Sequence, residues 1–428
     1  MKVAIAWYGA EGQSSYRYYV GKGDDVTIVT PKVGEQYPIP EGAKSIVQDD
    51  AFSLLNGFDI VVRSSGLRPD SLKTDAKIWS ATNEFFAVCP APIIGVTGTK
   101  GKGTTASLIA SILKAAGKTV HLVGNIGVPA LEVLPNIKSD DIVVYELSSF
   151  QLWDLEKSPH VAVVLMIEPD HLDVHRDMEE YITAKQQIAA HQTSEDIAIY
   201  HPTNQFSKQI VSAGEGQKVR YGLSEDGGAY VKENTFIVHS NPLCSVETLQ
   251  LVGQHNLDNA CAAISAAWSY TQDKGAIEKG LHDFTSLPHR LKLVAEVKGV
   301  KYYDDSIATT PGSAVAALKS FAAPKVIILG GSDKGADYSE IVELCVQTNT
   351  KIIAVGQTGE AIHELACSKG ADSHRVTGGM SEVVSTAAGV AEAGSVVILS
   401  PASASFDQYK SYADRGEQFI AAVSQLIG

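Results

Sequence analysis

The sequence predicts an α/β protein with mostly parallel sheets, divided into two or three domains. At 428 residues the chain is too long for a single ordinary domain. Short apolar runs, of the kind that form buried parallel strands, alternate with helical stretches along most of its length. A glycine-rich segment at 95–105 lies between such a run and a helical pattern, which is the order of a strand, a phosphate-binding loop and a helix.

The composition is that of a globular protein whose partners are neither nucleic acids nor membranes. Apolar residues make up 44% of the chain and charged residues 20%, and the formal net charge of −14 disfavours anionic partners. The five cysteines include no Cys-x-x-Cys pair, which favours reduced thiols in a cytoplasm over disulfides or a zinc site. No apolar run reaches the roughly 18 residues of a membrane span. The N-terminus reads as a strand and not as a signal peptide, so we expect a cytoplasmic protein.

The first unit, residues 1–88, is predicted to place three strands around a glycine turn. Strands are expected at 3–7, 26–29 and 59–63, with a helix at 14–20. The turn at 9–12 (Gly-Ala-Glu-Gly) follows the first strand, where a dinucleotide-binding fold holds phosphate. The same spacing also fits a tight turn without a ligand.

The second unit, residues 89–286, begins at the proline-containing linker 89–92 and contains the glycine-rich segment. Strands are expected at 142–147 and 161–167, and helices at 106–116, 178–190 and 256–270. A polar stretch with β character covers roughly 195–250.

The glycine-rich segment predicts an ATP site. In a phosphate loop, backbone N–H groups surround the phosphates, a lysine reaches the β- and γ-phosphates, and a hydroxyl binds Mg²⁺. Gly95 lies one place early, and Gly103 stands where Ser or Thr is usual, so Thr104 would supply the hydroxyl. A glycine-rich turn without nucleotide is the alternative. The predicted phosphate-loop residues are Gly98, Thr99, Lys100, Gly101, Lys102, Gly103, Thr104 and Thr105.

The third unit, residues 287–428, is predicted to be another open α/β sheet. Its strands are expected at 326–329, 352–355 and 396–399, and its helices at 313–320 and 381–391. Small polar residues follow the strand at 300–303 and the strands at 326–329 and 396–399, and one of these three segments carries a lysine. Because ligands of such sheets bind at the carboxyl ends of strands, this pattern suits an anionic small molecule, such as a carboxylate.

Three further residues of the second unit are candidates for chemistry. Glu146 ends the strand predicted beside the phosphate loop, where a carboxylate suits Mg²⁺; a helix-capping or surface role is the alternative. His171 follows the next strand and is also compatible with a plain polar loop. By composition alone, Lys185 is a solvated helix lysine.

Five motifs taken together resemble the Mur ligases, and the resemblance spans the chain. The motifs are Gly98-Thr99-Lys100-Gly101-Lys102, Glu146-Leu147-Ser148-Ser149-Phe150-Gln151, Gly253-Gln254-His255-Asn256 with Asn259, His289-Arg290, and Ser400-Pro401-Ala402-Ser403-Ala404-Ser405-Phe406-Asp407-Gln408. The second and last motifs are typical of the branch of the family that adds glutamate.

The resemblance implies a Rossmann-like domain for a UDP substrate at 1–88, a central ATPase at 89–286 and a Rossmann-like glutamate domain at 287–428. The implied activity is ATP-dependent addition of D-glutamate to UDP-N-acetylmuramoyl-L-alanine through an acyl phosphate, in peptidoglycan precursor synthesis. The implied form is a monomer with small-molecule substrates and two Mg²⁺ ions.

The resemblance also implies roles for single residues. Lys102, His171 and Lys185 would be catalytic, and Lys185 matches the family's carbamylated lysine. The metal ligands would be Thr104, Glu146, His171 and Lys185. ATP would also contact Asn256, Asn259, Arg290 and Asp305. The UDP substrate would contact Gly9, Gly12, Gln13, Ser14, Ser65, Gly66, Asn125, Ser148 and Gln151. Glutamate would contact Thr309, Lys334, Ser405 and Tyr412.

Three departures from the family pattern leave alternatives open. Gly103 resembles the loop of folylpolyglutamate synthases, so a ligase of that kind is an alternative function, and residues 7–12 are a variant of the N-terminal turn. Ile307 stands where many members have lysine, so L-glutamate is an alternative substrate. A nucleotide-binding regulatory subunit is the non-enzyme alternative, and the retention of the complete predicted metal set argues against it.

Overall fold

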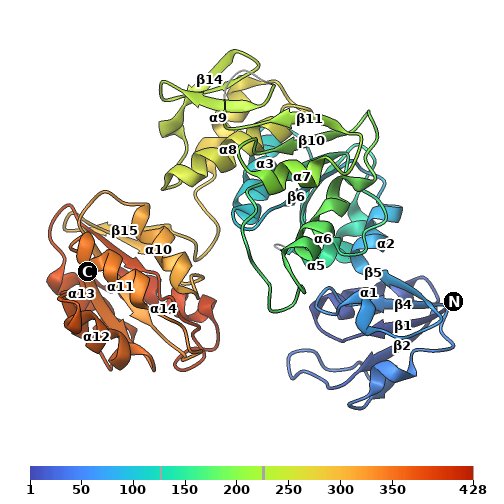
Figure 1. The fold of residues 1–428 in the computed structure, drawn as a ribbon, viewed down its shortest axis with the longest axis horizontal. Coiled ribbons are helices and arrows are strands. Elements are labelled where there is room, and N and C mark those ends of the chain that lie inside the picture. Colours follow the sequence, from blue (N-terminus) through green and yellow to red (C-terminus); the bar gives the residue numbers. More distant parts are fainter. Residues whose placement is uncertain (126–127, 224–226, 428) are drawn as a thin grey trace. The chain divides into compact units, whose positions relative to one another are not determined.

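The computed structural model describes residues 1–125, 128–223 and 227–427, and it divides into two compact units. The first unit comprises Met1–Leu249 and Asn256–Phe284, and the second comprises Gln250–His255 and Thr285–Gly428. Each of the three segments predicted from the sequence contains its own mostly parallel sheet, which confirms the α/β class (Figure 1). The domain boundaries at 88/89 and 286/287 stay a prediction. In the part of the chain so described, no helix combines the length and the apolar character needed to cross a membrane.

The N-terminal sheet is parallel, with the strand order β3-β2-β1-β4-β5. Its strands are β1 (Lys2–Ala6), β2 (Asp25–Thr30), β3 (Lys44–Val47), β4 (Ile60–Arg63) and β5 (Lys77–Ser80). Helix α1 (Ala10–Gly21) begins four residues before the expected start, because the glycine turn forms its first turn after the cap at Gly9. Helix α2 (Ala81–Val88) packs Phe85 and Phe86 against Tyr145 of the central sheet.

The central sheet is also parallel, with the order β11-β10-β9-β6-β8-β7. Its strands are β6 (Ile93–Thr97), β7 (Val120–Gly124), β8 (Ile142–Glu146), β9 (Val161–Val164), β10 (Ile197–Tyr200) and β11 (Gln217–Arg220). Every residue of β6, β8 and β9 is buried, as the apolar runs predict. Strand β9 ends at Val164, earlier than expected, although Leu165 and Met166 still bond to Thr97 and Thr99 at the end of β6 and in the loop that follows it.

Helices and a small antiparallel sheet complete the first unit. The helices are α3 (Lys102–Ala115), α4 (Ala130–Val133), α5 (Ser149–Leu152), α6 (Met178–Ala190), α7 (Gln205–Val211), α8 (Gln254–Ala267) and α9 (Lys274–Asp283). Strands β12 (Ala229–Lys232), β13 (Thr235–Val238) and β14 (Asn241–Ser245) pair antiparallel. Short 3₁₀ helices lie at Ala51–Leu54, Pro69–Ser71, Leu134–Asn136 and Val246–Thr248. Helices α3 and α9 pack closely against each other at Gly280. A Cβ added at this glycine would lie only 2.4 Å from the Cα of Ile112.

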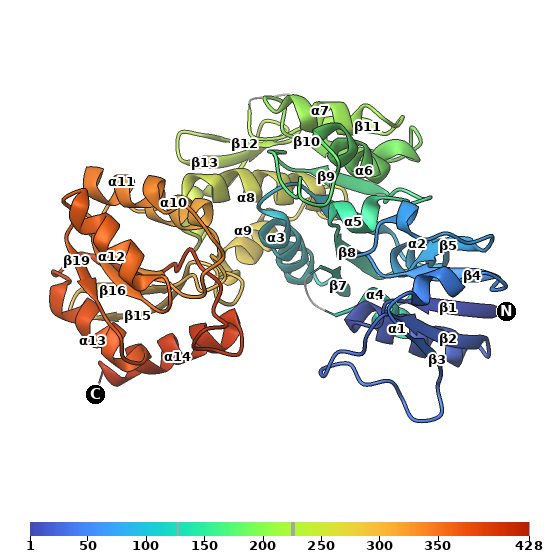
Figure 2. The same ribbon diagram turned by 60° about the horizontal axis from the view of Figure 1, so that its bottom comes forward.

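The second unit has one sheet with the order β15-β16-β20-β17-β18-β19, in which only β15 runs antiparallel to its neighbour. Its strands are β15 (Lys292–Val297), β16 (Val300–Asp304), β17 (Lys325–Gly330), β18 (Lys351–Val355), β19 (Ser373–Arg375) and β20 (Val396–Leu399). Helices α10 (Pro311–Lys319), α11 (Ser339–Gln347) and α12 (Gly359–Ser368) cover one face. Helices α13 (Met380–Val390) and α14 (Tyr412–Gln425) cover the other (Figure 2). The three strands whose polar ends stood out in the sequence, β16, β20 and β17, are neighbours in this sheet.

Candidate functional site

The glycine-rich segment forms a loop between the central strand β6 and helix α3. Gly101 has φ of 82°, in the left-handed region, and a Cβ there would lie 2.4 Å from Oδ1 of Asn259. A Cβ at Gly98 would lie 2.7 Å from the Cβ of Leu165. Both glycines are therefore required by the packing of the loop, and Gly101 also by its backbone conformation.

Helix α3 begins at Lys102 and not at 106, so the hydroxyl-rich stretch forms its first turn. The N–H groups of a first helical turn lack intrahelical partners and attract anions. The Lys102 ammonium donates to the carbonyl oxygens of Gly98 at 3.1 Å and Thr99 at 2.9 Å, which holds it over the loop. Thr104 and Thr105 are buried, whereas the Lys100 side chain is exposed and pairs with Glu168 at 3.5 Å.

Asn259 of α8 closes one side of the loop. Its Oδ1 accepts from Thr105 Oγ1 at 3.3 Å, and its Nδ2 donates to Asn256 Oδ1 at 3.0 Å. The two asparagines that were predicted to contact ATP are thus hydrogen-bonded to each other, and one of them supports the loop.

Lys185 of α6 lies beneath the same loop and is almost completely buried. Its ammonium nitrogen bonds to Thr97 Oγ1 and to the carbonyl oxygen of Gly98, both at 3.1 Å, and lies 4.8 Å from the ring centre of Tyr181. Burial, and then the nearby charge of Lys102, hold the pKa of Lys185 well below its usual range.

Glu146 is buried at the carboxyl end of β8, where its Oε1 accepts from Asn125 Nδ2 at 3.5 Å. His171 lies in the loop after β9 with φ of 54°; its ring is half exposed, 5.0 Å from Phe150 and 3.6 Å from Asp170. Within the described ranges, no three His, Cys, Asp or Glu side chains are grouped so that they could hold a metal ion. The metal-ligand roles stay a prediction.

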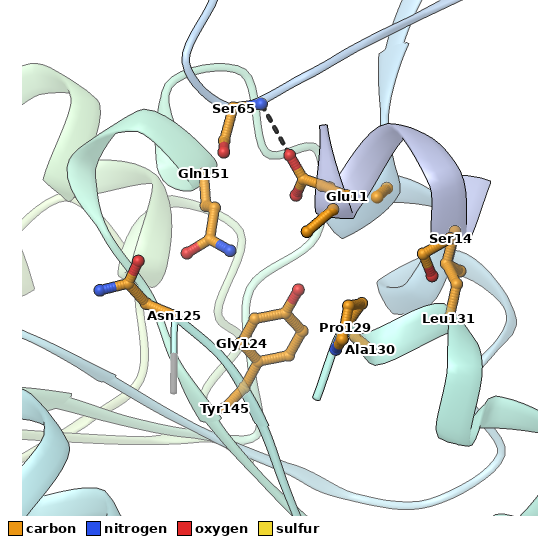
Figure 3. A pocket seen from close by; sticks show the side chains of 12 residues that line it. Glu11, Ser14, Ser65, Gly124, Asn125, Pro129, Ala130, Leu131, Tyr145 and Gln151 are labelled. Carbon is orange, nitrogen blue, oxygen red and sulfur yellow. Dashed lines mark hydrogen bonds between the residues drawn. The ribbon is translucent and has the colours of Figure 1, made fainter. Parts of the chain in front are cut away.

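A pocket of about 280 Å³ lies between the N-terminal sheet and the central sheet (Figure 3). Four residues predicted to bind the UDP substrate line it, namely Ser14, Ser65, Asn125 and Gln151. The lining does not include Gly9, Gly12, Gln13, Gly66 or Ser148. Ser148 instead caps α5 and fixes Gln151, whose Oε1 accepts from Ser148 N at 3.0 Å.

Sequence reasoning missed two residues that line this pocket with polar side chains, Glu11 and Tyr145. Glu11 lies inside the glycine turn, and its Oε2 accepts from Ser65 N at 2.7 Å. Tyr145 precedes Glu146 in β8, so its side chain points to the opposite face of the sheet. That alternation is a signal that could have identified Tyr145.

In the second unit, Arg290 lies between two residues with left-handed backbone, His289 and Leu291. Asp305 anchors this segment, because its Oδ1 accepts from Leu291 N at 3.1 Å and its Oδ2 from Ser400 Oγ at 2.7 Å. Burial raises the pKa of Asp305 to about 7.

The four predicted glutamate contacts also lie in the second unit. Thr309, Lys334 and Ser405 follow the neighbouring strands β16, β17 and β20, and Tyr412 begins α14. Ser405 is buried, and the other three are exposed. Arg415, which the sequence did not single out, is buried and donates to the carbonyl oxygens of Ser306, Ser403 and Ala404.

A phosphate loop on a parallel sheet, a polar pocket beside it and a second α/β unit define a multidomain nucleotide-dependent enzyme. The family model "Mur ligase middle domain" matches residues 96–267, and "Mur ligase, glutamate ligase domain" matches residues 289–403. The chain belongs to the Mur ligase family.

Curated relatives are similar over most of the chain. A protein of Acetivibrio thermocellus named UDP-N-acetylmuramoylalanine–D-glutamate ligase is 37% identical over 391 residues, covering 87% of this chain and 84% of that protein. A protein of the same name from Symbiobacterium thermophilum is 34% identical over 447 residues, covering 99% and 98%.

Solved structures share the fold at low identity. UDP-N-acetylmuramate-alanine ligase of Thermotoga maritima has a TM-score of 0.61 at 17% identity and covers 99% of both chains. FolC of E. coli, in complex with DHPP and ADP, has a TM-score of 0.54 at 19% identity and covers 81% of this chain and 91% of its own. At such low identity these likenesses show the fold alone. The likeness to FolC therefore does not favour a folate-type substrate for this chain.

Proposed function

We propose that this chain is an ATP-dependent ligase that joins D-glutamate to UDP-N-acetylmuramoyl-L-alanine in peptidoglycan precursor synthesis. The names of the curated relatives support the substrate pair. One observation carries the proposal: Asn125 lines the pocket and also bonds to Glu146 at the carboxyl edge of the central sheet. A substrate held in the pocket can therefore direct its carboxylate toward the phosphate loop.

The main obstacle to the reaction is the repulsion between two anions, and the phosphate loop reduces this repulsion. A carboxylate is a poor electrophile, and it must approach a triphosphate that is also anionic. The Lys102 ammonium and the N–H groups of the first turn of α3 stabilise the negative charge on the phosphate oxygens. On this proposal, Lys102 exchanges its bonds to loop carbonyls for bonds to phosphate.

We assign the metal sites by the chemistry of the donors. Glu146 and Thr104 offer oxygen atoms, which Mg²⁺ prefers, and with His171 and a carbamylated Lys185 they would hold two ions. Bound Mg²⁺ would supply further neutralisation of phosphate charge. Carbamylation needs a neutral amine: the Lys185 nitrogen bonds to the carbon of CO₂, and a proton is released. The lowered pKa of Lys185 increases the share of the neutral amine.

Two group transfers follow. An oxygen of the alanine carboxylate attacks the γ-phosphorus of ATP, and ADP leaves with the electrons of the broken P–O bond. The glutamate amine then attacks the acyl carbon, phosphate leaves, and the amine loses a proton as the amide forms. Thr309, Lys334, Ser405 and Tyr412 are proposed to bind glutamate. Arg290, Asp305, Asn256 and Asn259 are proposed to contact ATP.

Phosphate release tests this proposal. The purified chain is supplied with MgATP and UDP-N-acetylmuramoyl-L-alanine, and D- or L-glutamate is added separately. We expect release with D-glutamate, from a monomeric cytoplasmic enzyme. Release with L-glutamate alone would assign the chain to the other isomer, as Ile307 allows, and no release with either would reject the proposal.

A further inference from the structure

A buried histidine, His175, takes no part in the chemistry proposed above. It follows His171 by four residues and is 1% exposed. Its ring is stacked on that of Phe150, with 5.4 Å between the ring centres and 5° between the planes. The ring centres of Trp153 and Tyr181 lie 4.5 Å and 5.2 Å away. Three aromatic side chains thus enclose the imidazole and fix its orientation.

The two ring nitrogens of His175 have different surroundings. Its Nε2 lies 2.9 Å from Oγ of Ser149, the first residue of α5, and the two form a hydrogen bond. Its Nδ1 has no hydrogen-bond partner among the described residues and lies 3.9 Å from Oε2 of Glu180. A buried polar atom without a partner costs stability. A phenylalanine would fill the same space without that cost, so packing alone does not explain a histidine at this position.

His175 also joins elements that carry proposed catalytic residues. Through Ser149 it contacts α5, which begins three residues after Glu146 at the end of β8. Through Tyr181 it contacts α6, where the ring of Tyr181 lies 4.8 Å from Nζ of Lys185. The imidazole therefore lies where the ends of these elements meet.

The backbone of His171 depends on the same place. Its φ of 54° lies in the left-handed region, which is costly for a residue with a Cβ and persists only where neighbouring contacts hold it. The carbonyl oxygen of His171 accepts from the N–H of Val174 at 3.1 Å and from that of His175 at 2.9 Å, which closes the turn 171–175. Phe150 contacts both rings and lies 5.0 Å from that of His171. The far end of the turn is thus the part that is anchored in the core.

We propose that His175 is a positioning residue, which fixes the turn 171–175 to α5 through Ser149 and thereby sets the direction of the His171 ring. The backbone N–H of His175 closes the turn, and its side chain ties the turn to the helix that follows β8. The inference rests on the proposed function for what His171 does in the reaction, and it adds how that side chain is held in place.

Two variants remove the anchoring bond from either side. His175→Phe keeps an aromatic ring in the enclosure, and Ser149→Ala removes only the hydroxyl. NMR of histidine-labelled protein follows the ring protons of His171, which carry the ring-current shift of Phe150 and are assigned by their loss in His171→Asn. In both variants we expect this shift to shrink toward that of an exposed histidine.

The same variants are measured as enzymes. We expect kcat to fall roughly tenfold, the worth of one buried hydrogen bond, while KM for UDP-N-acetylmuramoyl-L-alanine stays unchanged. The double variant should be no worse than the more damaged single variant, because both changes remove the same bond.

His121→Phe is the matched control. Its Nε2 lies 2.8 Å from Oδ2 of Asp141 at the amino ends of β7 and β8, the opposite edge of the same sheet. This variant should lower Tm but leave the His171 signal and kcat unchanged. His175→Phe should show the reverse pattern, with little change in Tm, because it also removes the unpaired Nδ1.

Three results would overturn the inference. They are an unmoved His171 signal in His175→Phe and Ser149→Ala, losses of kcat that multiply in the double variant, and an equal movement of the His171 signal in His121→Phe. The NMR measurement needs no turnover. A chain that releases no phosphate with either glutamate isomer, but whose His171 signal depends on His175 and Ser149, would reject the proposed ligase and leave the positioning of His171 standing.

Discussion

Gly101→Ala should disrupt the phosphate loop through one identifiable neighbour. The new Cβ would lie 2.4 Å from Oδ1 of Asn259, so that side chain must move. Its movement breaks the bond from Thr105 at 3.3 Å and the bond to Asn256 at 3.0 Å. The left-handed φ of 82° adds a separate penalty for any residue with a Cβ.

The two contributions can be separated by magnitude. An L-residue in the left-handed region costs about 1–2 kcal/mol, and each lost buried hydrogen bond costs about 1 kcal/mol. Gly101→Ala should therefore lower the free energy of unfolding by about 3–4 kcal/mol. In an Asn259→Ala background, where the clash and both bonds are absent, only about 1–2 kcal/mol should remain.

Scanning calorimetry of the four chains of this double-mutant cycle measures the coupling. For a unit of this size each kcal/mol moves Tm by about 2 °C, so a coupling of about 2 kcal/mol corresponds to about 4 °C. An equal loss of Tm in both backgrounds would refute the reasoning, because it would show that Asn259 does not restrict the loop at Gly101.

Three further predictions concern the chemistry and its pH dependence. Thr104→Ala should reduce phosphate release more than Gly103→Ser, since Thr104 is proposed to supply the metal hydroxyl; the reverse order would mean that the loop register is wrong. Lys185→Ala should lose activity, and bicarbonate or acetate should partly restore it, whereas full activity without additives would reject a carbamylated Lys185. Because burial raises the pKa of Asp305 to about 7 in the folded chain, the folded state holds this proton more tightly than the unfolded state does. Stability should thus fall as pH rises from about 4 to 7, and Asp305→Asn should flatten that part of the Tm profile; identical profiles would contradict the assignment.

The central sheet could be predicted because its signal is local. Strands buried on both faces need continuous apolar runs, and β8 and β9 were expected from such runs. Helix α6 was expected with the bounds that it has, 178–190. The start of α3 was missed by four residues, because glycine and threonine are poor helix formers and the fold of the loop overrides their propensity.

The site depends on contacts that no local pattern encodes. Lys185 looks like any helix lysine, and only the fold places its nitrogen under the loop, 3.1 Å from Thr97. In the sequence, Glu11 is an ordinary acidic residue of a turn. Its hydrogen bond with the N–H of Ser65, which follows β4, depends on the fold. Arg415 lies about a hundred residues from Ser306, one of the groups that it binds. Such contacts can be identified only when the order of the strands in each sheet is known.

The strand order of the second unit also has a consequence for synthesis of the protein. Strand β20 (Val396–Leu399) lies between β16 and β17, although nearly seventy residues separate it from the end of β17 in the chain. When β16 and β17 have been synthesised, they therefore do not yet have the strand that joins them in the native sheet. The sheet can be completed only after β20, one of its last elements, has left the ribosome. The first unit can fold while the second is still being made, and a chain that stops before residue 396 would keep the phosphate loop but lack the centre of the second sheet.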